Sequence, residues 1–195
     1  MIKLFHLVWL ISIFGCSESG VFTSDADGCF GYGSQEDSPY ILPYGSDLEP
    51  LVEQGNCSHA THWGTTRFAY DFEMEVGDMV LAARAGEVTT IKNDAEEGPG
   101  ISGYNEVYIQ HEDGTIASYV HLLKDTFLVS EGEMVSQGQE LAQSGSSGVS
   151  NPHLHFQVDD DDKLIQTLPI VFTNTRPHIL GLVQGESYTP TAGEN

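Results

Sequence analysis

Two histidines separated by one residue, His153 and His155, stand out in the stretch SNPHLHFQV near the C-terminal end of the chain. In an extended strand, successive side chains point to opposite faces, so the two imidazoles share one face and Leu154 lies on the other. One face then belongs to the core, and the other can carry polar chemistry. A solvated strand face explains such a pair equally well, so the pair gains meaning only if further ligand-type residues converge on it.

Candidate partners for this pair come from two earlier segments. In HWGTTRFAYDF, His62 lies nine positions before Asp71, and in SYVHL, His121 follows an apolar strand pattern. Zinc sites use three or four N, O or S ligands at about 2.0–2.3 Å, and catalytic sites keep one position open. Two histidines and one carboxylate, with spare histidines beside them, therefore predict an open zinc site with groups for acid–base work.

The first residues, MIKLFHLVWLISIFGC, have the layout of a secretory signal. Lys3 precedes an apolar run over residues 4–14, which is too short to span a bilayer as a stable helix. The end of this run, ISIFGC, resembles a bacterial lipoprotein processing site, in which Cys16 is lipidated. We expect export to the cell envelope, in the periplasm or as an outer membrane lipoprotein, with ordinary signal cleavage and secretion as the alternative.

Lipidation of Cys16 leaves Cys29 and Cys57 as one pair, and in an oxidising compartment that pair predicts a disulfide. Cys57 also lies close to His59 and His62, which raises the alternative that it is a metal ligand. Zinc thiolate sites usually bring more than one nearby cysteine, so the disulfide is favoured. His59 remains a rival to His62 as the first metal ligand.

The charge balance restricts the partners of the chain. Its 195 residues include 7 basic and 29 acidic side chains, for a formal net charge of −22. Such an excess repels nucleic acid and anionic lipid, so we expect neither as a partner. The length suits one domain, and we expect a monomer. The run Asp159–Asp162 is expected to form a solvated turn and not a calcium site.

The chain divides into four parts by composition. These are a signal peptide with a lipoprotein-like cleavage site (1–16), a Ser-, Gly- and Asp-rich spacer (17–38), a domain (39–172) and a polar tail (173–195). The domain consists of short apolar or alternating segments between glycine turns, with Asp113-Gly114 as the clearest hairpin turn. No long 3.6-residue period occurs outside the signal, so the predicted fold class is mostly β, a compact antiparallel sheet or sandwich with little helix. His178, in the tail, is expected at the surface.

Taken together, these motifs resemble the lysostaphin-type zinc metallopeptidases, the LytM-like peptidoglycan endopeptidases, from about Pro39 to Phe172. The resemblance rests on HWGTTRFAYDF, VGDMVLAARAGEV, VYIQHEDGTIASYVHL, GEMVSQGQELAQSGSSG and PHLHFQV, in the order found in that family. It implies an antiparallel domain of the duplicated hybrid motif type, one Zn2+ per chain and a peptidoglycan peptide as substrate. The segment MEVGDMV departs from the family's frequent MPVGTPV, which bears on loop shape more than on zinc.

The resemblance also implies a role for each candidate site residue. His62, Asp71 and His155 would hold zinc, while His121 and His153 would act on the substrate and the attacking water. All five positions are filled, unlike in degenerate relatives that serve only as activators. The expectation is an exported zinc metalloendopeptidase that cuts stem or cross-bridge peptides. The alternative is a non-catalytic envelope module that binds wall peptide or activates an amidase.

Overall fold

The computed structural model describes residues 29–58, 60–100, 103–161, 164 and 166–191. Within these ranges the chain forms short strands and one 3-10 helix, η1. The bounds are β1 Val52–Gln54, η1 Gly64–Thr66, β2 Tyr70–Glu73, β3 Met79–Leu81, β4 Gly86–Lys92, β5 Glu106–Gln110, β6 Ile116–Val120, β7 Met134–Val135, β8 Glu140–Gln143 and β9 His153–Asp159. The expectation of a mostly β domain with little helix is confirmed.

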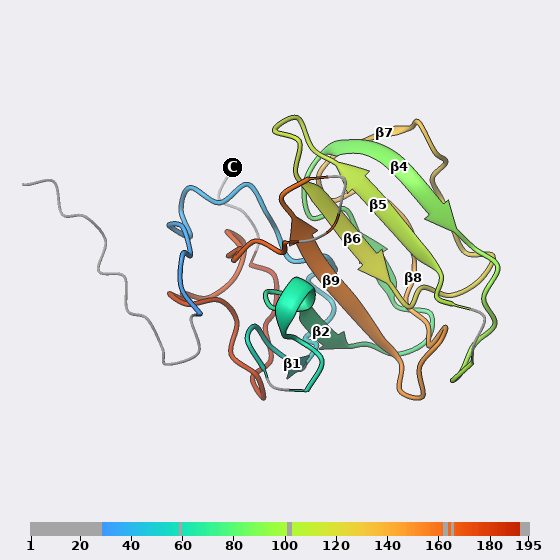
Figure 1. The fold of residues 1–195 in the computed structure, drawn as a ribbon, viewed down its shortest axis with the longest axis horizontal. Coiled ribbons are helices and arrows are strands. Elements are labelled where there is room, and N and C mark those ends of the chain that lie inside the picture. The colour runs from blue at the N-terminus through green and yellow to red at the C-terminus, as the bar shows by residue number, and fades with distance from the viewer. Residues whose placement is uncertain (1–28, 59, 101–102, 162–163, 165, 192–195) are drawn as a thin grey trace, which may run out of the picture.

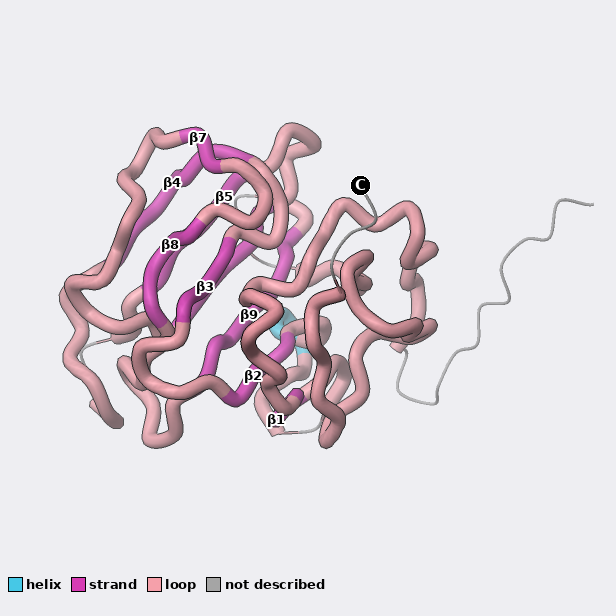
Figure 2. The backbone as a smooth tube through the Cα atoms, turned by 180° about the vertical axis from the view of Figure 1, so that it is seen from behind, coloured by secondary structure: helices cyan, strands magenta, loops and turns pink. Residues whose placement is uncertain are grey.

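The strands form two antiparallel sheets. The larger has seven strands in the order β1-β2-β9-β6-β5-β4-β7, and the smaller pairs β3 with β8. Figure 1 shows the larger sheet, and Figure 2, from behind, shows β3 and β8 lying over its far side. Strand β9 therefore lies in the interior of the sheet, between β2 and β6, where both of its edges are hydrogen-bonded.

The main core lies on one face of the larger sheet, and the alternation of β9 shows which face that is. Leu154, Phe156 and Val158 are fully buried among the core side chains, while His153 and His155 point to the opposite face. Strand β2 follows the same rule, since Tyr70 and Phe72 enter the core. The candidate site thus lies on the face that does not pack against β3 and β8.

The predicted hairpin at Asp113-Gly114 is confirmed. Gly114 has a positive φ of 88°, a conformation that glycine adopts without steric cost. The His111 amide donates to the carbonyl of Thr115 at 2.8 Å, which closes the turn between β5 and β6. The turn fixes the register between β5 and β6, and His121 directly follows the last residue of β6.

Both ends of the described chain pack beside β1 and β2. In Figures 1 and 2, the segment after Cys29 and the segment from Gln166 to Thr191 lie side by side there. Phe172 packs against the rings of Phe72 and Phe156, with centroids 6.3 and 6.0 Å apart. The aromatic core is thus completed by a residue close to the end of the chain.

Two expectations about surface residues are wrong. His178 is buried, and its Nε2 atom accepts a hydrogen bond from the amide of Phe172 at 3.0 Å. Asp159, expected in a solvated turn, is buried as the last residue of β9. The predicted signal peptide and Cys16 lie outside the described residues. In the part of the chain that the structure describes, no helix has the length and apolar character needed to cross a membrane.

Candidate metal centre and active site

Three predicted ligands from three chain segments meet on the open face of the larger sheet. Asp71 in β2 and His155 in β9 are directly opposite partners in the ladder, and Nδ1 of His155 lies 2.8 Å from Oδ1 of Asp71. His62 comes from the loop before η1, and its Nε2 lies 3.2 Å from Oδ2 of Asp71. One ligand atom from each residue lies within 4.8 Å of the other two.

The hydrogen-bond partners of these residues determine which imidazole atoms can bind a metal. Nδ1 of His62 lies 3.0 Å from the carbonyl oxygen of Gly55 and must donate to it. Nε2 of His155 lies 3.0 Å from Oε1 of Gln157, whose amide nitrogen in turn donates to Asp159. In the neutral imidazoles, Nε2 of His62 and Nδ1 of His155 therefore carry lone pairs.

Three electron-pair donors, two imidazole nitrogens and a carboxylate, consequently face one another. Such a group is stable only with a proton or a cation between its members, so the residues fit a divalent metal ion. In the absence of a metal, a proton on these facing nitrogens takes its place. Burial raises the pKa of Asp71, but hydrogen bonds donated by His155 and His62 in that state outweigh burial and hold the pKa below its usual value. Burial lowers the pKa of His155, and the hydrogen bond to Asp71 more than reverses that effect.

Two further predicted residues, His121 and His153, lie beside this group. Their ring centroids are 4.6 Å apart, and Nε2 of His153 lies 3.9 Å from Oδ1 of Asp71. Nδ1 of His121 donates to the carbonyl of Ser147 at 2.8 Å, and Nδ1 of His153 donates to that of Asn151 at 2.9 Å. Each imidazole thus keeps its Nε2 atom for substrate or water.

Burial, and to a lesser extent the neighbouring imidazoles, lower the pKa of His121 to about 4. The ring is therefore neutral at pH 7, with a lone pair on Nε2, which is the form that a general base requires. His121 also has a positive φ of 67°. This conformation is uncommon for a residue other than glycine and is often found at functional sites.

Four of the five candidate residues, Asp71, His121, His153 and His155, border a cleft of about 430 Å³, whereas the buried His62 does not line it. Its floor is the open face of β5, β6 and β9, and its walls come from the loops around Thr61, Tyr104 and Val149. The residues lining it are Thr61, Thr66, Asp71, Tyr104, Glu106, Tyr108, Ser118, Val120, His121, Val149, His153, His155 and Gln157. A cleft that places two free imidazole nitrogens beside a metal site suits metal-assisted hydrolysis.

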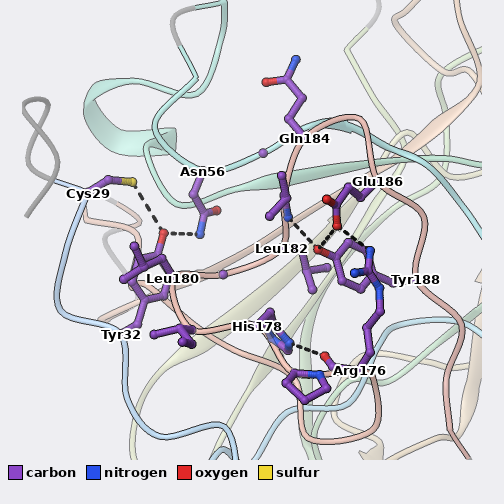
Figure 3. A pocket seen from close by; sticks show the side chains of 15 residues that line it. Cys29, Tyr32, Asn56, Arg176, His178, Leu180, Leu182, Gln184, Glu186 and Tyr188 are labelled. Carbon is purple, nitrogen blue, oxygen red and sulfur yellow. Dashed lines mark hydrogen bonds and ion pairs between the residues drawn. The ribbon is translucent and has the colours of Figure 1, made fainter. Parts of the chain in front are cut away.

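The loop that carries His62 is supported from behind by residues from the two ends of the described chain. Cys57 forms the predicted disulfide with Cys29, so it is not available as a metal ligand. The Asn56 amide is hydrogen-bonded to the hydroxyl groups of Tyr32 and Tyr70, at 2.7 and 2.8 Å. Figure 3 shows Cys29, Tyr32 and Asn56 together on one side of a cavity of about 590 Å³.

The other side of this cavity belongs to the C-terminal segment, including Leu182 and Gln184 (Figure 3). A Cβ atom on Gly55 would lie 3.4 Å from the Leu182 carbonyl oxygen and 3.4 Å from the Gln184 amide. The C-terminal segment thus packs directly against the residue whose carbonyl orients His62. Leu182 and Gln184 therefore help to hold the Gly55 carbonyl in the position that orients the His62 ring.

Some contacts of the candidate site give no signal in the sequence. The carbonyl groups of Gly55 and Ser147 orient two imidazoles, and backbone atoms give no residue-type signal. Gln157 could have been found, because it follows His155 by two positions and so shares its face of the strand. His111 is buried away from the cleft, with its Nδ1 hydrogen-bonded to the Ala85 carbonyl, and His59, the rival first ligand, lies outside the described residues.

Known proteins resemble this chain over part of their length. Peptidoglycan DD-endopeptidase ShyA from Vibrio cholerae is 37% identical over 100 residues, which is 51% of this chain and 20% of ShyA. Murein hydrolase activator NlpD from Escherichia coli is 33% identical over 93 residues, which is 47% of this chain and 22% of NlpD. This chain therefore spans only a fraction of the length of these relatives.

A solved structure agrees with the fold. The catalytic domain of the prophage-encoded M23 protein EnpA from Enterococcus faecalis superposes with a TM-score of 0.51 at 22% identity, over 66% of this chain and 93% of that one. Residues 65–167, more than half of the chain, match peptidase family M23. The motifs, the antiparallel fold and this match agree, and the chain is a member of peptidase family M23.

Proposed function

We propose that the protein is an exported zinc metalloendopeptidase that hydrolyses peptide bonds in the stem or cross-bridge peptides of peptidoglycan. The observation that carries the proposal is the convergence of His62, Asp71 and His155, with two free imidazole nitrogens beside them. A protein that only bound wall peptide would need neither three converging electron-pair donors nor a buried neutral imidazole.

His62, Asp71 and His155 are the proposed zinc ligands, through Nε2, a carboxylate oxygen and Nδ1. When bound, zinc supplies a Lewis acid that polarises a peptide carbonyl and lowers the pKa of water to about 7. The protein contributes the orientation of each ligand. The Gly55 carbonyl holds the His62 ring and Gln157 holds the His155 ring, and such partners commonly change metal affinity by about 10–100-fold.

His121 and His153 are the proposed proton-transfer and substrate-binding groups. His121 is neutral at pH 7 and its Nδ1 proton is bonded to Ser147, so its Nε2 atom is able to take the proton of the attacking water. That proton is then delivered to the leaving amine. His153, 3.9 Å from Asp71, contacts the substrate on the metal side of the cleft.

The assignment of the substrate to peptidoglycan is supported by the relatives. ShyA is named a peptidoglycan DD-endopeptidase and NlpD a murein hydrolase activator, so both names refer to the hydrolysis of peptidoglycan. Export, with a lipid anchor at Cys16 or ordinary cleavage, follows from the N-terminal sequence. The disulfide Cys29–Cys57 fits an oxidising compartment outside the cytoplasm.

The test is the release of new amines from purified, cross-linked peptidoglycan, with and without a zinc chelator. We expect release that the chelator abolishes, with masses that identify the bond cut. His155→Ala is expected to lose both zinc and release, whereas Glu75→Gln, at an exposed carboxylate outside the cleft, keeps both. A zinc-replete and fully active His155→Ala protein contradicts the ligand assignment.

The similarity to NlpD supports a second candidate, an activator of a peptidoglycan amidase. The two functions differ in their need for metal. An activator stimulates the amidase equally in its zinc-free form and releases no amines by itself. A result of this kind with zinc-loaded protein rejects the endopeptidase proposal in favour of the activator.

A further inference from the structure

The floor of the cleft continues past the metal centre as a polar surface built from neighbouring strands. Tyr108 in β5, Ser118 in β6 and Gln157 in β9 are successive ladder partners, and all three line the cleft. In the adjacent row, Glu106 and Val120 lead to the proposed ligand His155. Glu106 is two strands from His155, about 10 Å at the usual strand spacing.

Glu106 is an unusual residue for this position, because acidic side chains are rarely this deeply buried, and those that are need a partner. It is 3% exposed and forms an ion pair with Nζ of Lys92, its ladder partner in β4. The Lys92 side chain is 57% exposed, so its ammonium group reaches Glu106 from solvent. The carboxylate therefore already binds an ammonium group, and that group can move from Glu106 into the surrounding water.

Ser118 supplies an independent indication that this floor binds a ligand. The residue is 3% exposed, it lines the cleft, and its hydroxyl has no hydrogen-bond partner among the described residues. An unpaired buried hydroxyl costs about 1–3 kcal/mol. Beside it, burial and then the charge of Glu106 and the hydrogen bond to it raise the pKa of Tyr108, which stays a neutral phenol.

We infer that Glu106, Tyr108 and Ser118 form a subsite for an ammonium group on the substrate peptide, about two strand spacings from the metal centre. The carboxylate of Glu106 accepts from the ammonium in exchange for Lys92, and Ser118 gains a partner. The net charge of −22 favours the approach of a cationic group over an anionic one. This inference rests on the proposed endopeptidase function, since it names a feature of the peptide that is cut.

The test compares cross-linked muropeptides carrying free side-chain amines with the same muropeptides after N-acetylation, which removes the charge. Reductive dimethylation, which keeps the charge, controls for size. For the native protein we expect kcat/KM to fall at least about tenfold on acetylation and much less on dimethylation. In Glu106→Gln the ratio between free and acetylated substrates falls to about one. In Lys92→Met it rises, because the resident ammonium is gone.

The opposite effects of these two variants separate ligand binding from a structural role, which would slow both substrates alike. Glu96→Gln, which breaks the exposed pair with Lys124 outside the cleft, is the matched control and keeps the native ratio. Equal kcat/KM for free and acetylated muropeptides in the native protein overturns the subsite. So does a native ratio in Glu106→Gln.

A binding measurement distinguishes failure of the subsite from failure of the proposed function. Zinc-loaded His121→Ala protein is titrated calorimetrically with free and with acetylated muropeptides, alone and combined with Glu106→Gln. Preferential binding of the free amine that depends on Glu106, without cleavage by the native protein, supports the subsite and rejects the endopeptidase. Cleavage without such a preference supports the endopeptidase and rejects the subsite.

Discussion

Asp71 and His155 face each other across the β2–β9 ladder, with Oδ1 of the carboxylate 2.8 Å from Nδ1 of the imidazole. The distance between these two groups is therefore set by strand register, and not by a flexible loop. A slip of one residue would place Leu154 opposite Asp71 and turn the imidazole into the core. The buried partners Phe72 and Leu154 oppose such a slip.

Removal of the His121 imidazole should separate metal binding from turnover. His121→Ala keeps the three proposed ligands, so zinc content is expected to remain at one per chain. Turnover should fall about 10²–10⁴-fold, the usual contribution of a general base. Zinc analysis and amine release on the same preparation check both parts. Loss of zinc from this variant would instead make His121 a ligand.

The pH dependence of turnover should reflect the low pKa of His121, about 4. Protonation of Nε2 removes the lone pair, so the base is active above this pH and is lost as the pH falls through about 4. No loss due to His121 is expected near pH 6.5, the ordinary value for histidine. The measurement is kcat/KM from about pH 3.5 to 8 with zinc content determined at each point, because acid also releases metal.

Gln157 should control zinc affinity without binding zinc. Its Oε1 accepts from Nε2 of His155 and its amide donates to Asp159. In Gln157→Leu the ring loses its orienting partner, and we expect the zinc Kd to rise about 10–100-fold. Gln157→Glu keeps the acceptor and should retain most of the affinity. Competition with a chelating dye measures both, and equal Kd values for the Gln157→Leu variant and the native protein would contradict the role.

The disulfide should stabilise the fold and also hold the loop that carries His62, the first proposed zinc ligand. Cys29 and Cys57 are 28 positions apart, and closing such a loop contributes about 3–4 kcal/mol in the chain-entropy model. Cys57 lies five residues before His62. The double Cys→Ser variant, or reduced protein, should therefore unfold at lower urea and bind zinc more weakly. The reductant should leave the double variant unchanged, which excludes an effect on the metal itself.

Asp159 should make the protein less stable at alkaline pH. Burial, and the nearby Asp160 and Asp161 carboxylates, raise its pKa to about 6, while Gln157 and His155 oppose the shift. Because the folded pKa exceeds the unfolded one, the stability that this group contributes is complete below about pH 4. It is lost as the pH rises through about 6.

Asp159→Asn removes this ionisation. Relative to native protein, the variant should gain about 2–3 kcal/mol in unfolding free energy between pH 4 and pH 8. Urea unfolding in chelator at both pH values measures the gain, and Glu75→Gln, at an exposed carboxylate that does not contribute to the shift, is the control. A difference between the Asp159→Asn variant and the native protein that does not change with pH would refute the shift.

Local patterns predicted those parts of the protein that depend on neighbouring residues. The alternation around His153 and His155 correctly predicted a strand with one apolar and one polar face, and Asp113-Gly114 correctly predicted a hairpin. Pairing of β2 with β9 joins residues 84 positions apart, and no local pattern encodes such a register. The five site residues were grouped by motif, and the structure brings them together, while their roles remain proposals.

The failures have a common physical cause. His178 lies in a polar stretch, yet its partner is a backbone amide, that of Phe172, which only the folded chain brings near. Asp159 begins a run of four acidic residues, and the strand continues one position further than composition indicates. Both failures arise from contact with backbone that is brought near by folding, that of Phe172 for the His178 ring and that of Ile116 in β6 for Asp159. Such contacts leave no trace in composition or periodicity.

The packing behind Gly55 also determines when the proposed metal-binding group becomes complete. His62 is synthesised about 120 residues before Leu182 and Gln184, which pack against its supporting residue Gly55. A nascent chain thus acquires its first ligand long before it can hold that ligand in place. A chain truncated before Leu182 would retain all five candidate residues and lose this support, so a list of intact motifs would overestimate its activity.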